Sequence, residues 1–149
     1  ARIGPAMFAP SKRQTQELPL TALSSFLRKA LLADAVVSGA ACLAMIAGAD
    51  FTHTLLGLPS ALLFWAGVSL IPFIVTLVMV VRANAAPTGL IISLIAINIA
   101  WVLASLFVAF GPMFTPTLLG KIFIVAQAAT VAVFAELQII GLRRASVTA

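Results

Sequence analysis

Four long apolar runs dominate the hydrophobic pattern of the chain, and none of them alternates regularly with polar residues. They cover about residues 30–49, 59–81, 90–110 and 118–142. Each run reaches the roughly 20 residues that an α-helix needs to cross the ~30 Å hydrocarbon core of a bilayer. A continuous apolar run of this length indicates a helix rather than a strand, and a helix satisfies its own backbone in lipid. The pattern therefore predicts an all-α membrane protein built as a four-transmembrane-helix bundle.

The segments outside the four runs are polar. Residues 1–25 contain three prolines and the mixed stretch SKRQTQE, so this tail is expected to be disordered or extended when alone. It is expected to dock on a partner subunit or a neighbouring copy at the cytoplasmic face. Some 25 largely polar residues before the first run also argue against a cleavable signal peptide. The last five residues, 145–149, are too short to fold. The expected organisation is thus a tail over 1–25, a transmembrane domain over 26–144 and a short C-terminal tail.

Composition supports a membrane location. The chain of 149 residues is 62% hydrophobic and 9% charged, whereas soluble domains contain roughly 25% charged residues. A soluble fold with so little charge could not cover its own surface with polar groups. The solvent around this chain is therefore expected to be mostly lipid.

The distribution of basic residues predicts an orientation. Eight of the nine Lys and Arg residues fall on one side of the expected bundle, and Lys121 falls on the other. By the positive-inside rule, both termini and the middle loop face the cytoplasm. The net charge of +5 does not indicate nucleic-acid binding, because no basic or aromatic stripe accompanies it. The residues expected to anchor the cytoplasmic side are Arg28, Lys29, Arg82, Arg143 and Arg144.

One heptapeptide occurs twice, as FTHTLLG at 51–57 and as FTPTLLG at 114–120, with six of seven residues identical. Weaker matches around it span two helical hairpins, which favours an internal duplication. Because each unit would contain two helices, the units would be parallel repeats related by an axis along the membrane normal. Thr54 or Thr117 is suited to cap the helix that follows. The heptapeptide is therefore expected to form the outer turn of each hairpin, and a paired binding lip on the outer face is the alternative.

Small and polar residues recur along each run at the spacing of a helix face. Such residues pack against neighbouring helices rather than against lipid, so the four stripes are expected to face one another. The recurring positions are Asp34, Ser38 and Cys42 in the first run, Trp65, Ser69, Pro72 and Thr76 in the second, Asn98, Trp101 and Ser105 in the third, and Ala128, Ala132 and Glu136 in the fourth. The stripes predict an intramembrane polar cluster of Asp34, Ser38, Asn98, Trp101 and Glu136.

Asp34 and Glu136 are the acidic residues within the runs, and an acid at membrane depth is a functional hypothesis by default. From the run boundaries, Asp34 lies roughly 6 Å and Glu136 roughly 9 Å from the cytoplasmic ends of their helices, at 1.5 Å per residue. Both are expected to face the bundle interior and to share a proton, a water or a basic neighbour such as Arg82. Three interpretations stay open: an interhelical clasp, a proton- or cation-linked binding site, and snorkelling to water.

Catalytic and metal-binding chemistry is sparse in this chain. His53 is the single histidine and Cys42 the single cysteine, which excludes bis-histidine haem ligation and leaves few ligands for zinc. The sequence contains no GxSxG, P-loop or HExxH motif. We therefore expect a non-enzymatic protein with no cofactor and no metal.

The chain resembles small four-span inner-membrane proteins of bacteria without assigned chemistry. The features that carry this resemblance are the early Asp34, the stretch TLLGLPSALL, the NIAW of the third run and the closing GLRR. That resemblance implies a bacterial inner membrane and no catalytic residues. The chain is also similar to the small multidrug resistance transporters in having four short helices and an acid in the first, although Asp34 is expected near the membrane edge rather than at its centre.

Two functions are compatible with these features. The first is an accessory or structural subunit of a larger membrane complex, whose partners are the lipid bilayer and other subunits or further copies of the chain. The alternative is a small proton- or cation-linked transporter, or a small-molecule-binding membrane protein, that uses Asp34 and Glu136.

Single cysteines test the predicted orientation. A cysteine placed at Thr52 or Thr115, in the outer turns, is expected to react with a membrane-impermeant thiol reagent added outside intact cells. Labelling that occurs only from the cytoplasmic side would overturn the topology.

Overall fold

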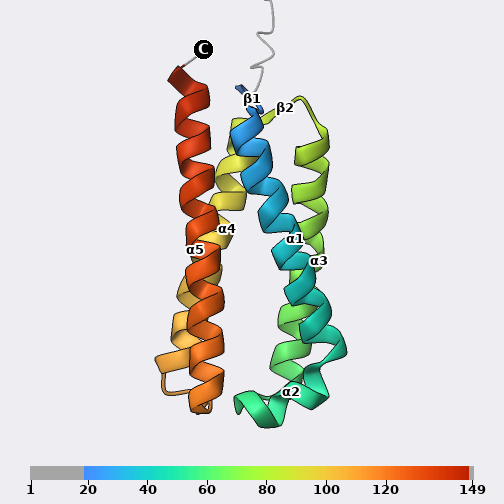
Figure 1. The fold of residues 1–149 in the computed structure, drawn as a ribbon, viewed down its shortest axis with the longest axis vertical. Coiled ribbons are helices and arrows are strands. Elements are labelled where there is room, and N and C mark those ends of the chain that lie inside the picture. Colours follow the sequence, from blue (N-terminus) through green and yellow to red (C-terminus); the bar gives the residue numbers. More distant parts are fainter. Residues whose placement is uncertain (1–18, 148–149) are drawn as a thin grey trace, which may run out of the picture.

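The computed structural model describes residues 19–147, so most of the expected tail over 1–25 lies outside the described residues. Four long helices lie side by side in alternating directions (Figure 1). They are α1 (Ser25–Ala47), α3 (Ser60–Arg82), α4 (Thr88–Phe110) and α5 (Leu118–Val147). Each is long and apolar enough to cross a membrane. The prediction of an all-α protein with four helices of membrane-spanning length is confirmed.

Capping, rather than hydropathy, decides where α1 begins. The side chain of Ser24 accepts a hydrogen bond from the backbone N–H of Leu27, as expected of a helix N-cap. The helix therefore starts at Ser25, five residues before the apolar run. At the other end of the chain, α5 continues to Val147, beyond the expected boundary at 144.

A two-stranded ribbon closes the end of the bundle at which the described chain begins. Strand β1 (Leu20–Ala22) pairs antiparallel with β2 (Ala85–Pro87), with Thr21 opposite Ala86. Pro87 disfavours a helical conformation at the preceding residue, so the connection between α3 and α4 is extended and its backbone groups are free to pair. Part of the expected tail is therefore ordered against the middle loop.

The four long helices form two hairpins. α1 packs along α3 and α4 packs along α5, while contacts between α1 and α5 join the hairpins. The large, fully buried side chains gather in one apolar cluster towards the ribbon end, and they include Leu27, Leu31, Leu77, Ile91 and Leu94. A smaller cluster, which includes Leu56 and Leu63, lies at the opposite end beside the short helix α2 (Ala49–Leu56).

The basic side chains lie mostly at the ribbon end. Arg28 donates from Nη1 to the carbonyl of Val81 at 2.6 Å and from Nη2 to that of Ala83 at 2.9 Å, so it caps the carbonyl end of α3. Arg144 lies 5.0 Å over the ring of Phe26. Lys121 lies in the first turn of α5 at the opposite end. The structure thus separates the charges along the bundle axis, and which end faces the cytoplasm stays a prediction.

The two copies of the heptapeptide adopt different conformations. The first copy is helical over α2 and ends at Gly57, whose φ of 67° is left-handed. The second copy is irregular up to Thr117, and α5 begins at the next residue, Leu118. Pro116 replaces His53 in this copy; proline has no N–H and also restricts the residue before it, so the helix cannot form there. The expected cap is present in the second copy, because the Thr117 hydroxyl accepts from the N–H of Gly120 at 3.0 Å.

The two copies also contact each other at the end of the bundle opposite the ribbon, which is named the outer end after its predicted orientation. Thr117 donates from its backbone N–H to the carbonyl of Leu56 at 3.0 Å and from its hydroxyl to the carbonyl of Leu55 at 2.6 Å. A Cβ at Gly120 would overlap the carbonyl group of Leu56. This contact ties α2 of the first hairpin to the start of α5 in the second.

Substitution of Gly120 tests this close approach. Gly120→Ala is expected to lower the free energy of unfolding by roughly 1–3 kcal/mol, the usual cost of overpacking. Gly89→Ala is the matched control, because a Cβ there meets nothing within 4 Å. Thermal unfolding in detergent measures both, and equal midpoints for the two variants would contradict the contact.

Candidate functional site

Buried polar side chains from three helices meet inside the bundle. Asp34 and Ser38 come from α1, Asn98 from α4 and Gln138 from α5. Asp34 and Gln138 are 0% exposed. The structure therefore brings together three of the residues expected in the polar cluster and adds Gln138.

The hydrogen bonds of this cluster converge on the Asp34 carboxylate. Its Oδ1 accepts from the Ser38 hydroxyl at 3.0 Å, and its Oδ2 accepts from Asn98 Nδ2 and from Gln138 Nε2, both at 2.7 Å. Asn98 Nδ2 also lies 3.4 Å from Gln138 Oε1. An ionised carboxylate only accepts hydrogen bonds, so three donors match that form. Burying a charge without such partners would cost a large free energy. Here the neutral side chains of Ser38, Asn98 and Gln138 provide the hydrogen bonds.

Asp34 lies deeper than the run boundaries indicate. It is the ninth residue beyond Ser25, which places it about 14 Å along α1 at 1.5 Å per residue. Asn98 lies ten residues beyond the start of α4, at a similar depth. The expectation that Asp34 sits one turn from the helix end is wrong, because the Ser24 cap starts the helix earlier.

Glu136 lies on the outer face of α5 and is exposed, so the expectation that it faces the interior is wrong. Successive four-residue steps rotate a stripe by about 40° each, and the interval from Ala128 to Glu136 contains two of them. The inward face instead alternates steps of three and four residues, through Ala128, the half-buried Val131, Ala135 and Gln138. That alternation is the signal that would have identified Gln138.

The two acids do not share a partner. Within residues 19–147, the Glu136 carboxylate makes no hydrogen bond or ion pair, whereas Asp34 is bonded to Ser38, Asn98 and Gln138. Arg82, the basic neighbour expected between them, is exposed at the end of α3. The expected joint site of Asp34, Glu136 and a basic residue is therefore not formed by the described part of the chain.

The other expected polar positions have separate roles. Cys42 donates from Sγ to the carbonyl of Gly67 at 3.2 Å, which ties α1 to α3. The stripe expected along 59–81 does not face the interior: Trp65 is 66% exposed, and Ser69 and Thr76 bond to carbonyls of their own helix. Trp101 lies beside the Asp34 cluster and borders the cavities between the hairpins.

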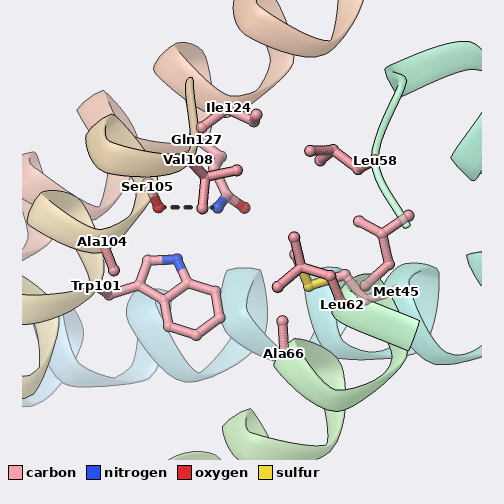
Figure 2. Close-up of a pocket in the computed structure, with 11 residues that line it drawn as sticks. Met45, Leu58, Leu62, Ala66, Trp101, Ala104, Ser105, Val108, Ile124 and Gln127 are labelled. Atoms are coloured by element: carbon pink, nitrogen blue, oxygen red, sulfur yellow. Dashed lines mark hydrogen bonds between the residues drawn. The ribbon is translucent and has the colours of Figure 1, made fainter. Parts of the chain in front are cut away.

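Cavities lie between the hairpins, and two of them adjoin each other. The central one, of about 320 Å³, is bordered by all four long helices and includes Ser38 and Asn98 in its wall. The second, of about 160 Å³, lies towards the outer end (Figure 2). Trp101 and Gln127 border both cavities, and no Asp, Glu, Lys or Arg lines either of them. The site therefore consists of a sealed carboxylate and neighbouring cavities with neutral walls.

Within the described ranges, no group of three or more His, Cys, Asp and Glu side chains lies close enough to hold a metal ion. Comparison of the chain with protein-family models, with curated proteins and with solved structures finds no match.

Three substitutions compare how much the Asp34 cluster and Glu136 contribute to the free energy of unfolding. Asp34→Asn replaces one acceptor oxygen with a donor group, so it is expected to lower the free energy of unfolding by roughly 1–3 kcal/mol. Ser38→Ala removes one membrane hydrogen bond and is expected to lower it by about 0.6 kcal/mol. Glu136→Gln is the control and is expected to leave the isolated bundle unchanged. Thermal unfolding in detergent provides the ranking, and a larger loss for Glu136→Gln than for Asp34→Asn would refute it.

Proposed function

We propose that the chain is a non-enzymatic accessory subunit of a larger membrane complex. It contacts its partner through the side of α5 that points away from the other helices of the bundle. The observation that carries this proposal is Glu136. Its carboxylate is exposed on a helix of membrane-spanning length and makes no polar contact with residues 19–147.

The depth of Glu136 makes an outward position unfavourable in lipid alone. Glu136 precedes the exposed Arg143 by seven residues, so it lies about 10 Å deeper than that basic residue at 1.5 Å per residue. Acidic side chains at such depth are costly in hydrocarbon and are normally paired. The Glu136 carboxylate would be paired by a neighbouring transmembrane helix that carries a Lys, an Arg or another hydrogen-bond donor at the same depth.

The side chains around Glu136 suit a helix contact. Ala126, Ala129 and Val133 lie on the same outward stripe and are exposed. Small residues allow helix backbones to approach closely, and packing of this kind stabilises association within membranes. We therefore place the partner helix along this stripe.

A transporter driven by Asp34 has less support. Such a transporter would exchange a proton or a cation at Asp34 with the central cavity, yet Asp34 is 0% exposed and its two oxygens are bonded to three donors. We assign Asp34 a structural role in joining the hairpins, which agrees with an accessory subunit.

Co-purification tests the partner contact. Wild-type protein extracted in a gentle detergent is expected to migrate with a partner identified by mass spectrometry, and Glu136→Leu is expected to release it, because the carboxylate is lost. Glu136→Gln keeps a hydrogen-bonding group and is expected to reduce the association partly. Ser69→Leu is the matched control on the exposed face of α3 and is expected to keep the partner.

Thermal unfolding of the released Glu136→Leu protein distinguishes lost association from lost folding, and its midpoint is expected to match that of the isolated wild-type chain. A wild-type chain that migrates alone, or a Glu136→Leu complex of unchanged composition, would overturn the proposal. A partner of the same mass as the chain would identify a second copy as the occupant.

A further inference from the structure

The outer cavity has apolar walls from both hairpins. Met45, Leu62 and Ala66 come from the first hairpin, and Val108 and Ile124 come from the second (Figure 2). Its volume of about 160 Å³ is close to that of an engineered apolar cavity of ~150 Å³ that holds benzene. One aromatic ring therefore fits the space.

Three polar groups interrupt this apolar lining on one wall. Gln127 donates from Nε2 to the Ser105 hydroxyl at 3.5 Å, and Figure 2 shows the indole nitrogen of Trp101 on the side of this pair. Within residues 19–147, neither the Trp101 N–H nor the Gln127 amide oxygen has a hydrogen-bond partner. The wall therefore presents at least one donor and one acceptor to whatever enters the cavity.

The chemistry of the wall selects a neutral molecule with one hydroxyl group. A charged ligand would lose its hydration with no countercharge in the lining. A purely apolar ligand would leave the Trp101 donor and the Gln127 acceptor unpaired. A hydroxyl can accept from the first and donate to the second. We propose that this cavity is a binding site for a small neutral phenol.

Access to the site is from the membrane. The central cavity shares Trp101 and Gln127 with the outer one, and its border includes Ile97, which is 48% exposed, and Phe123, which is 45% exposed. A lipid-soluble ligand can therefore enter between the hairpins without crossing the sealed Asp34 cluster. This inference is independent of the partner proposed for α5.

Tryptophan fluorescence reports on the site directly, because the chain has two tryptophans and one of them borders the cavity. The Trp65→Phe variant keeps Trp101 as the sole reporter. In purified full-length protein in detergent at pH 7, neutral 4-bromophenol is expected to quench Trp101 saturably. Bromobenzene, which lacks the hydroxyl, is expected to bind roughly tenfold more weakly, as the loss of its hydrogen bonds predicts.

The reciprocal variant, Trp101→Phe, keeps the exposed Trp65 as a reporter of probe dissolved in the micelle, and its quenching is expected not to saturate. Saturation there with the same midpoint as at Trp101 would overturn the assignment. Equal affinity of the two probes for Trp101 would also overturn it, since the cavity would then be an apolar crevice suited to acyl chains.

Two substitutions in the Trp65→Phe background locate the binding. Gln127→Leu keeps the approximate volume and removes the amide, so the affinity for 4-bromophenol is expected to fall about to that for bromobenzene. Ala66→Phe fills the cavity and is expected to abolish saturable quenching, whereas Ala61→Phe, at an exposed position of the same helix, is expected to retain it. Unchanged affinity in Gln127→Leu would refute the site, and this comparison decides the matter if Ala66→Phe fails to fold.

Discussion

The hydrogen bonds to the Asp34 carboxylate set how the two hairpins fit together. Inside lipid, the hydrophobic effect does little to drive helices together, because lipid tails provide an equally apolar environment. A buried polar network, in contrast, is strongly unfavourable when it is only partly satisfied. Ser38 lies on the same hairpin as Asp34, but Asn98 and Gln138 lie on the other. The register in which all three donors reach the carboxylate is therefore favoured over registers in which one hairpin slides along the other.

Specific hydrogen bonds also explain where the hairpins meet and where they do not. At the ribbon end, Thr21 of the first hairpin bonds to Thr88 at the start of the second, and at the outer end Thr117 bonds to Leu55 and Leu56. The central and outer cavities lie between the Asp34 cluster and the Thr117 contact. In a membrane, no strong hydrophobic effect closes such cavities. A bundle whose hairpins are joined by hydrogen bonds at both ends and at the Asp34 cluster can therefore keep cavities that the core of a soluble protein would fill.

The sequence predicts the helices well because membrane thickness demands long apolar runs. It predicts local structure less well where that structure depends on a single backbone N–H or on pairing with a distant segment. His53 and Pro116 differ by one backbone N–H, and that difference separates a helical turn from an irregular one. Strand β1 exists through pairing with β2, some 65 residues away, which no local pattern indicates. Gln138 was missed because a strict four-residue spacing drifts around the helix.

The two intramembrane acids show that depth alone does not define a role. Asp34 and Glu136 are both carboxylates on membrane-spanning helices, but Asp34 lies where three helices converge and Glu136 lies about 200° around α5 from the inward Gln138, by the geometry of 3.6 residues per turn. The requirement of Asp34 for hydrogen-bond donors is met within the chain by Ser38, Asn98 and Gln138. The requirement of Glu136 is not met by residues 19–147. Under the proposed function, the donor that this outward acid lacks would come from a helix of another subunit.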